Sequence, residues 1–157
     1  MIDKIDDNTI KDLLDKLKID KIKKLVVGGV IFHSNNKFLL LKRVSDDFMG
    51  DLVELPSGTV DEGETVLEAL QREIKEETSL DIKSIDKYID SFDYLSSSGK
   101  KTRQLNFLLT TKTSNVRLNP KEHSAHYWID SNKINNLNIS TETKNIIKNI
   151  KKENYGI

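Results

Sequence analysis

The sequence lacks cysteine, net charge and long hydrophobic runs. Without cysteine there are no disulfide bonds, no thiolate metal site and no cysteine nucleophile. The 25 basic and 25 acidic residues cancel, so no overall field attracts DNA or RNA, and we expect no nucleic acid polymer as a partner. Apolar runs such as Phe38 to Leu41 are too short to span a bilayer, and the first ten residues lack the apolar core of a secretion signal. We therefore expect a cytoplasmic protein with no membrane partner.

The remaining composition is that of one ordinary globular protein. A chain of 157 residues with 36% hydrophobic and 32% charged residues can bury a sizeable core. No internal repeat, low-complexity tract or long linker divides it. We expect a single domain over residues 1–157 that acts as a monomer or a homodimer.

Hydrophobic periodicity predicts strands that alternate with helices. Apolar residues at helical spacing occur in the first 24 residues, after Thr65, and between Ser140 and Lys152. Thr65 followed by Glu68 forms a capping box that starts the middle helix near Val66. Short apolar or β-branched runs predict strands at 25–33, 37–43, 52–55, 85–95, 101–111 and 127–129. These elements together indicate an α/β sandwich.

Two hairpins are expected among these strands. Residues 34–36, Ser-Asn-Asn, link the first pair by a short turn. Ser96 to Gly99 link the pair at 85–95 and 101–111 by a tip that can overhang a substrate. Gly28-Gly29 in the first strand indicates a close backbone approach or a bulge.

The segment from Gly58 to Leu80 carries most of the functional information and reads GTVDEGETVLEALQREIKEETSL. At about 100° per residue, Glu73, Glu76 and Glu77 share one flank of its helix. Glu77 lies at the edge of the apolar stripe, whereas Thr78 is predicted on the opposite, exposed side.

This segment has an excess of negative charge. It holds seven carboxylates against Arg72 and Lys75, a balance of −5 in a neutral chain. Like charges three or four positions apart on a helix repel, and a half-buried carboxylate without a partner is costly. A hard divalent cation such as Mg²⁺ is the natural counter-charge, because it takes oxygen ligands and completes its shell with water and phosphate. A solvated acidic helix face in a structural protein that binds no metal is the alternative.

The same segment resembles the Nudix box, the signature of the Nudix hydrolase family. The matching positions are Gly58, Glu64, Arg72, Glu73, Ile74, Glu76, Glu77 and Leu80. One position departs from the pattern: Ser79 stands where the family has glycine, at a helix exit where a left-handed residue commonly ends the last turn. A non-glycine residue in that conformation costs about 1 kcal/mol. Because serine carries no carboxylate, the departure concerns local geometry more than chemistry.

The resemblance implies the Nudix fold, a mixed β-sheet sandwiched between helices (α/β/α), over a core from Leu25 to Asp130 with helical extensions at both ends. It implies hydrolysis of a nucleoside diphosphate linked to another group, with Mg²⁺ as the cation and Mn²⁺ as a substitute. It assigns the metal ligands to the Gly58 carbonyl, Glu73, Glu76, Glu77 and a late-loop carboxylate, Glu122. One box glutamate would serve as general base, and Arg72 would orient the cluster and pair with Glu64.

The substrate expected from the resemblance is a (d)NTP, cleaved to NMP and pyrophosphate by a MutT-like pyrophosphohydrolase. Hydrolysis of ADP-ribose, nucleotide sugars or dinucleoside polyphosphates is the alternative, but the proline that ADP-ribose hydrolases often carry downstream of the box is missing. A catalytically silent nucleotide-binding module would usually have lost box carboxylates, and all are present. An isopentenyl-diphosphate isomerase shares the fold but uses a cysteine, which this chain lacks.

Candidate substrate contacts lie outside the box. Arg43 and Arg103 are scarce arginines among many lysines, and arginine suits bidentate phosphate binding. Phe48 and Tyr94 offer aromatic faces that can stack on a base.

A histidine pair offers a zinc alternative. His123 and His126 lie close to Glu122, but a catalytic zinc site needs three protein ligands, and no cysteine or third histidine is near. Unless Glu122 joins them, we interpret both histidines as ordinary loop and strand residues.

Overall fold

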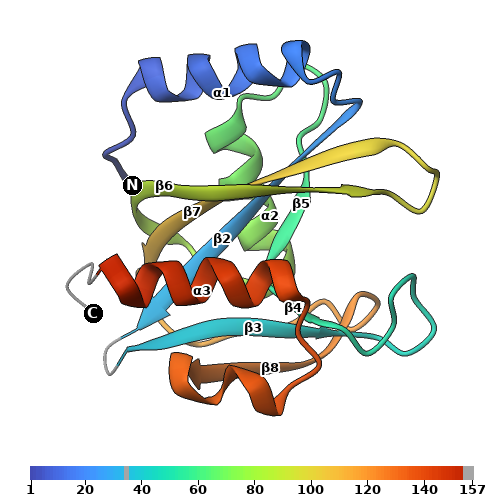
Figure 1. Cartoon of the computed structure of the whole chain (residues 1–157). Helices are drawn as coiled ribbons and strands as arrows, with labels where there is room; N and C mark the ends of the chain where they lie inside the picture. The colour runs from blue at the N-terminus through green and yellow to red at the C-terminus, as the bar shows by residue number, and fades with distance from the viewer. Residues whose placement is uncertain (34–35, 154–157) are drawn as a thin grey trace.

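A computed structural model describes residues 1–33 and 36–153 and shows a mixed β-sheet with helices on both faces (Figure 1). The helices are α1 (Asp7–Ile19), α2 (Val66–Thr78), α3 (Thr141–Glu153) and a 3₁₀ helix, η1 (Ser131–Asn136). The strands are β1 (Ile2–Asp3), β2 (Lys24–His33), β3 (Lys37–Arg43), β4 (Val53–Glu54), β5 (Ser57–Thr59), β6 (Ile82–Leu95), β7 (Lys101–Thr111) and β8 (His123–Asp130). The α/β architecture expected from the sequence is confirmed.

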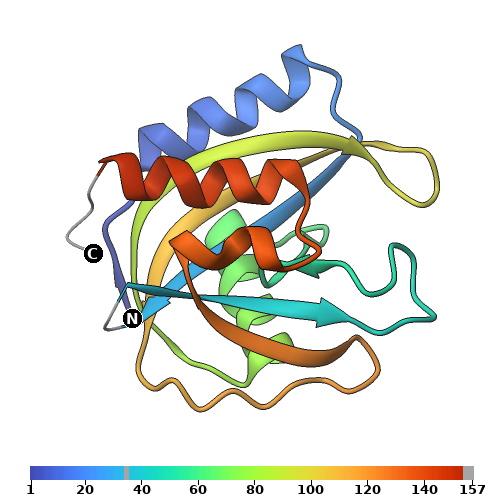
Figure 2. The same ribbon diagram turned by 60° about the horizontal axis from the view of Figure 1, so that its bottom comes forward.

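Strand β2 is the junction of the sheet. The strand order is β1-β6-β7-β2-β3-β4, with β5 paired to β2 and β8 paired to β3. β2 runs parallel to β7 from Lys24 to Ile31, whereas it meets β3 only at the pairs formed by Phe32 and His33. β3 continues along β8 instead. Figure 2 shows β3 and β8 separating from β6 and β7 beyond this junction.

The first predicted hairpin is therefore formed only at its tip. Residues 26–31 are buried and apolar on both faces, so β2 is a central strand that needs a neighbour along each edge. The turn predicted at 34–36 falls partly outside the described residues. The second predicted hairpin is confirmed, and its first strand begins at Ile82 instead of Ile85.

The strands divide their side chains between two cores, one on each face of the sheet. On β3, Leu39 and Leu41 face the core beneath α2, while Phe38 and Leu40 face the core beneath α3. This alternation follows from the two-residue period of a strand, and it places α2 and α3 on opposite faces.

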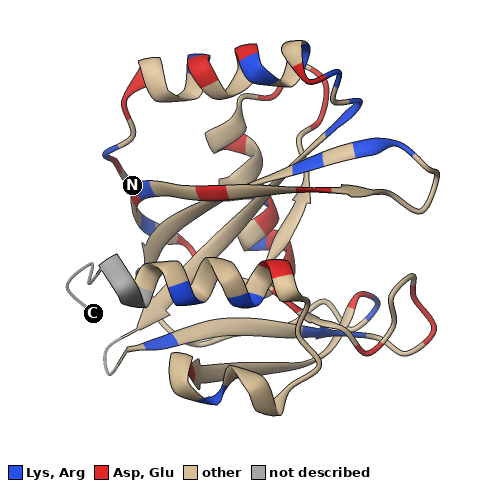
Figure 3. Ribbon diagram, viewed as in Figure 1, with Lys and Arg blue, Asp and Glu red and all other residues tan. Residues whose placement is uncertain are grey.

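Both outer helices pack on the sheet through the apolar stripe that the sequence predicts. Ile10 and Leu13 of α1 contact the core beneath α2, and Ile146, Ile147 and Ile150 of α3 are buried in the other core. Charges of both signs alternate along α1 (Figure 3). In the part of the chain that the structure describes, no helix combines the length and apolar character needed to cross a membrane.

Helix α2 begins and ends as the sequence predicts. The Thr65 hydroxyl accepts the Glu68 N–H at 3.1 Å, and Ser79 ends the helix in the left-handed region at φ 64°. Gly29 allows the sheet to approach the helix, because a Cβ there would lie 2.9 Å from Cδ1 of Ile74. The close approach predicted at the glycine pair is confirmed.

Thr78 contradicts the helical periodicity. It is predicted to be exposed but is fully buried. Its hydroxyl donates to the Ile74 carbonyl at 2.5 Å and accepts the Leu80 N–H at 3.1 Å, and its own carbonyl accepts the Arg117 N–H at 2.9 Å. The loop after β7 covers the last turn of α2, and helical periodicity alone does not include such a loop.

The remaining differences concern short or irregular elements. β1, β5 and η1 are not predicted, because segments of 2, 3 and 6 residues are too short to show a periodic pattern. β8 spans His123–Asp130 instead of 127–129, and β4 is limited to Val53–Glu54 instead of 52–55.

Candidate active site

Strand β5 passes directly over the acidic flank of α2. Gly58 pairs with Val27 of β2, which fixes its height above the helix. A Cβ at Gly58 would overlap the Glu73 carboxyl group, so any larger residue there would displace this carboxyl group. The box glycine and a box glutamate, predicted to share a site, are therefore in contact distance.

Arg72 ties the acidic loop to the helix. Its guanidinium contacts the two carboxylate oxygens of Glu64 at 2.6 and 2.9 Å and donates to the Thr59 carbonyl at 2.9 Å. It also reaches Glu73 Oε1 at 2.8 Å and Glu76 Oε2 at 3.2 Å. Hydrogen bonding from Arg72 lowers the pKa of Glu64 to about 2. Arg72 thus has the geometry expected of a residue that braces the loop and orients the carboxylates.

Glu77 is buried and, unlike Glu64, Glu73 and Glu76, forms no ion pair with Arg72. Its side chain is 8% exposed, and the ion pairs that Arg72 forms with described residues do not include it. Oε1 accepts the Ser57 N–H at 2.7 Å. Burial raises the pKa of Glu77 to about 9, and three neighbouring carboxylates add to the shift. Burial also raises the pKa of Glu73, although Arg72 opposes it.

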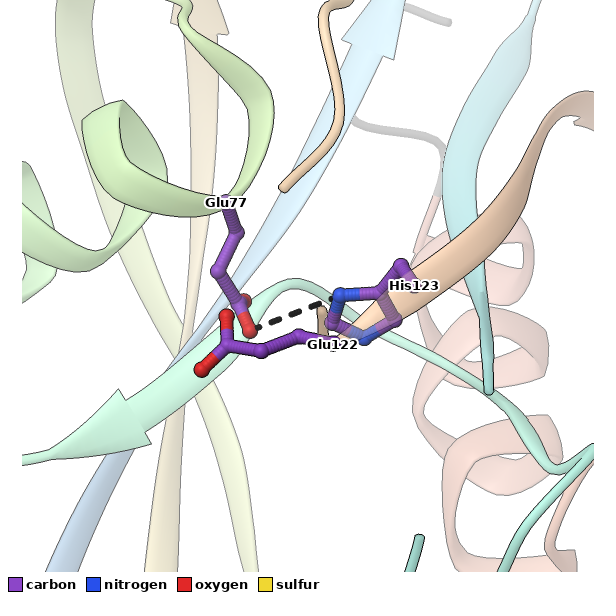
Figure 4. Close-up of side chains that lie close together, drawn as sticks. All are labelled: Glu77, Glu122 and His123. Atoms are coloured by element: carbon purple, nitrogen blue, oxygen red, sulfur yellow. Dashed lines mark ion pairs between the residues drawn. The ribbon is translucent and has the colours of Figure 1, made fainter. Parts of the chain in front are cut away.

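The start of β8 brings another carboxylate and a histidine to Glu77 (Figure 4). The Glu122 carbonyl accepts the N–H of Val44 just after β3, at 3.0 Å, which anchors the loop. Ser124 is an extra residue that bulges β8 opposite the last step of β3. Such bulges commonly re-aim side chains next to active sites. Ligand atoms of Glu77, Glu122 and His123 all lie within 4.8 Å of one another.

His123 links this group to β3 and β4. Its Nε2 lies 3.1 Å from Glu54 Oε2, and its Nδ1 lies 3.8 Å from Glu77 Oε2. Arg43 donates to the two Glu54 oxygens at 2.7 and 3.1 Å and to the Phe48 carbonyl at 2.6 Å. A continuous line of polar contacts therefore runs from Phe48 to Glu77.

These groups line a cavity of about 260 Å³, which we call the acidic cavity. Its lining residues are Arg43, Asp47, Glu54, Ser57, Gly58, Thr59, Glu73, Glu77, Glu122 and His123. Five carboxylates thus surround one arginine. Four of the five predicted metal ligands belong to this set. The fifth, Glu76, does not: its side chain is 56% exposed and contacts Arg72.

A second cavity of about 290 Å³ adjoins the first, and we call it the aromatic cavity. The two share Arg43, Glu54 and Ser57. The other residues that line it are Phe48, Met49, Leu52, Leu55, Phe92, Tyr94, Leu95, Gln104, Ser140, Glu142 and Thr143. The rings of Phe92 and Tyr94 lie 6.0 Å apart. Apolar and aromatic side chains therefore stand directly beside the carboxylates.

The structure brings three of the four predicted substrate contacts to these cavities. Phe48 and Tyr94 line the aromatic cavity, and Arg43 lies where the two cavities meet. Arg103 is not among the lining residues of either cavity, and its guanidinium pairs with Asp93 at 2.7 Å.

The donor set of the acidic cavity fits a divalent cation. Mg²⁺ prefers carboxylate and carbonyl oxygens, which this cavity concentrates. Glu73 and Glu77 are disfavoured as ions by burial, and Nδ1 of His123 is buried without a hydrogen-bond partner in the described part of the chain. A cation among these groups would offset both costs.

Sequence reasoning gave no site role to five residues that line the acidic cavity: Asp47, Glu54, Ser57, Thr59 and His123. Glu54 had a signal, since it is the charged residue within the otherwise apolar run 52–55. The sequence signal for His123 was weaker: it directly follows the predicted ligand Glu122. Ser57 contributes a backbone N–H to Glu77, which leaves no mark in the residue type.

Comparisons with known proteins agree with this geometry. The chain is 33% identical over 78 residues to the 8-oxo-dGDP phosphatase NUDT18 of Danio rerio, a match that covers 50% of this chain and 24% of that protein. It is 52% identical over 56 residues to the ADP-ribose pyrophosphatase of Methanocaldococcus jannaschii, covering 36% of this chain and 32% of that protein. The matches thus span about a quarter to a third of the length of these relatives.

Solved structures share the fold. The crystal structure of the MutT protein from Methanosarcina mazei Go1 has a TM-score of 0.75 and 22% identity, and the match covers 84% of this chain and 95% of that chain. The NUDIX domain family itself matches residues 22–150. With Glu73 and Glu77 of the box at one cavity and the family match extending over most of the sequence, this chain belongs to the NUDIX domain family.

Proposed function

We propose that this chain, acting as a single domain, is a metal-dependent hydrolase that cleaves a diphosphate linkage in a nucleotide, with Mg²⁺ as its cation and Mn²⁺ as a substitute. The observation that carries the proposal is the contact between the two cavities. A carboxylate-lined cavity suited to a cation opens beside an aromatic cavity suited to a base, and they share Arg43, Glu54 and Ser57. This arrangement suits a molecule with phosphates at one end and a base at the other.

The acidic cavity supplies the chemistry. A bound divalent cation offsets the charge of the carboxylates, polarises the P–O bonds and acidifies the attacking water. Glu73, Glu77 and Glu122 hold it, together with the carbonyl of Gly58, and Glu76 completes the set from the exposed edge of α2. An ionised box glutamate accepts the proton of the attacking water.

Arg72 serves as a positioning residue. It holds Glu73 and Glu76 at 2.8 and 3.2 Å and fastens the preceding loop through Glu64. Because its guanidinium is planar and offers several donors in a fixed geometry, lysine would not reproduce these contacts.

The aromatic cavity binds the nucleoside. Phe48, Phe92 and Tyr94 offer faces on which a base can stack. Arg43 lies between base and cation, where the phosphates of a nucleotide pass, and its guanidinium suits phosphate oxygens.

Nucleoside triphosphates are the substrate class we favour, with NMP and pyrophosphate as products. The fold shared with the Methanosarcina mazei MutT protein and 35% identity over 60 residues to an 8-oxo-dGTP diphosphatase of Escherichia coli support this choice. ADP-ribose is the second candidate, supported by the 52% identity to an ADP-ribose pyrophosphatase.

A substrate panel tests the proposal. Nucleoside triphosphates, oxidised purine nucleotides, ADP-ribose, dinucleoside polyphosphates and nucleotide sugars are incubated with Mg²⁺, and products are separated by ion-exchange chromatography. The wild type is compared with Glu77→Gln and with Glu68→Gln, which makes the same change on the exposed side of α2. We expect one substrate class to be cleaved by the wild type and by Glu68→Gln, and not by Glu77→Gln. Equal rates in all three proteins, or no cleavage of any compound, would overturn the proposal.

A further inference from the structure

His123 is a buried imidazole whose two nitrogens have different surroundings. The residue is 3% exposed. Its Nε2 lies 3.1 Å from Glu54 Oε2, whereas its Nδ1 has no hydrogen-bond partner in the described part of the chain. That second nitrogen faces the acidic cavity, 3.8 Å from Glu77 Oε2 (Figure 4).

Glu54 determines which nitrogen carries the proton. Arg43 holds both Glu54 oxygens, so this carboxylate is fixed as an acceptor. Because a carboxylate can only accept, we assign the proton of His123 to Nε2, which leaves the lone pair of the imidazole on Nδ1. A carboxylate that fixes the tautomer and orientation of a histidine is the usual support of a metal-bound imidazole.

The donor atoms around Nδ1 lie close enough for small side-chain rotations to bring them onto one ion. Ligands bound at about 2.0–2.2 Å stand about 3 Å apart when adjacent and about 4 Å apart when opposite in an octahedral shell, and about 3.4 Å apart in a tetrahedral shell. Nδ1 and Glu77 Oε2 are 3.8 Å apart, and the Glu122 carboxylate lies within 4.8 Å of both. We propose that His123 Nδ1 is a ligand in the cation site, joined by Glu77 and Glu122, so that the site binds borderline transition metals such as Co²⁺ and Zn²⁺ as well as Mg²⁺.

The nitrogen ligand changes the metal preference of the site. Carboxylate and carbonyl oxygens suit Mg²⁺, Ca²⁺ and Mn²⁺, whereas imidazole suits Zn²⁺, Ni²⁺ and other first-row metals. His126, the other half of the zinc alternative, is exposed further along β8 and is absent from the lining of the acidic cavity. The histidine that matters is therefore paired with carboxylates from α2 and its own loop, not with its neighbour in sequence.

Metal titration of matched variants tests this proposal. His123→Gln places an amide near the position of Nε2 and removes the Nδ1 lone pair, and His126→Gln makes the same change at an exposed site. Calorimetric titrations with CoCl₂, ZnCl₂ and MgCl₂ are run on each protein, without nucleotide. We expect His123→Gln to weaken Co²⁺ and Zn²⁺ binding by about 10- to 100-fold, to change Mg²⁺ binding far less, and His126→Gln to match the wild type. Equal losses for all three metals, or no loss, would contradict the proposal.

A measurement on the wild type covers the case in which His123→Gln does not fold. The chain has only three histidines, so long-range ¹H–¹⁵N spectra of ¹⁵N-histidine-labelled protein resolve each ring. Addition of ZnCl₂ should shift Nδ1 of His123 and leave the rings of His33 and His126 near their metal-free positions. An unshifted Nδ1 would overturn the proposal.

The proposal rests on the proposed function only in that both use the same cation site. Zn²⁺ bound through His123 in a protein that cleaves none of the panel would uphold this inference and refute the proposed function. If the protein cleaves a nucleotide but the signals of the His123 ring do not shift with Zn²⁺, the proposed function is upheld and this inference is refuted.

Discussion

The acidic and aromatic cavities adjoin each other but are built from the sequence in different ways. Half of the residues lining the acidic cavity lie between Ser57 and Glu77, in β5 and α2, and the others lie at the ends or in the connections of β3, β4 and β8. The aromatic cavity is lined by residues from Arg43 to Thr143, contributed by strands β3 to β7, the loop between β3 and β4, and α3.

From this difference we expect the acidic cavity to govern catalysis and the aromatic cavity to govern the choice of substrate. Half of the acidic cavity, which we propose to bind the cation, is encoded in one helix and the strand before it, where local spacing sets which side chains meet. The aromatic cavity, which we propose to bind the base, is formed only when distant segments pack together. Substitutions in the acidic cavity should therefore affect every substrate alike, whereas substitutions in the aromatic cavity should change which substrate is preferred.

The largest effect is expected for Glu77→Gln. The amide keeps the size of the side chain and can still accept the Ser57 N–H, but it removes the charge needed to hold a cation. We expect kcat/KM to fall by about 10³-fold or more, since cation-based stabilisation contributes several kcal/mol. The same variant should be more stable than the wild type in EDTA at pH 8, because it buries no ionisable group. Steady-state kinetics and thermal unfolding measure the two effects, and a variant that is both active and less stable would contradict the assignment.

A pH series with metal-free protein isolates the same carboxylate. The pKa of Glu77 rises from 4.5 in the reference state to about 9 in the folded protein. Between these values the unfolded chain has released the proton while the folded chain retains it, so rising pH favours unfolding by up to about 1.4 kcal/mol per unit. The stability that Glu77 contributes is thus greatest below pH 4.5 and is lost as pH rises to 9.

Taking the difference in stability between the wild type and Glu77→Gln at each pH removes the contribution of the other titrating groups. Thermal unfolding of wild type and Glu77→Gln is measured in EDTA from pH 5 to pH 9. The advantage of Glu77→Gln over the wild type should grow with pH. Saturating Mg²⁺ should abolish this trend, since the cation takes the place of the proton. A constant difference between the two proteins would show that Glu77 is ionised throughout the range.

An aromatic-cavity variant should behave differently. Tyr94→Ala removes one ring of the wall that Tyr94 forms with Phe92. Stacking on one aromatic ring contributes about 1–3 kcal/mol, so KM for the preferred nucleotide should rise about 5- to 100-fold. We expect kcat to stay within about threefold of the wild type, since no group that holds the cation is touched. Steady-state kinetics with Tyr94→Phe as control measures this, and a fall in kcat at unchanged KM would place Tyr94 outside base binding.

The smallest effect is expected at Ser79, the residue that ends α2. Ser79 has φ 64°, and its hydroxyl donates to the Arg117 carbonyl at 3.1 Å. Ser79→Gly relieves backbone strain of about 1 kcal/mol but gives up this exposed hydrogen bond and adds freedom to the unfolded chain. A net gain of about 0.5 kcal/mol in unfolding free energy is expected, with unchanged activity. Urea unfolding should place Ser79→Ala below the wild type, since alanine keeps the strain and loses the hydroxyl.

The contrast between the cavities also explains what could be predicted from the sequence. The flank shared by Glu73 and Glu77 and the left-handed Ser79 follow from spacing within one helix, and the structure reproduces them. Thr78 was predicted wrongly because a loop distant in sequence covers it. Phe48 and Tyr94 could be named only as aromatic candidates, since their place beside the acidic cavity depends on tertiary packing that no local pattern records.

Strand β2 was misjudged for the same reason. Its apolar run predicts a strand equally well whether it pairs in a hairpin or sits between two neighbours, and only the full topology reveals that it is central. His123 was interpreted as an ordinary residue because its role depends on Glu54 and Glu77, which lie far away along the chain.

Glu54 links two parts of the site, because it contacts both Arg43 and His123. It accepts hydrogen bonds from Arg43 on one side and contacts His123 on the other, so it links the arginine proposed to bind phosphate to the imidazole proposed to bind the cation. If the proposed roles hold, a phosphate that draws Arg43 toward itself would weaken its hold on Glu54 and, through Glu54, on the orientation of the imidazole. Two side chains would then connect the nucleotide to the cation.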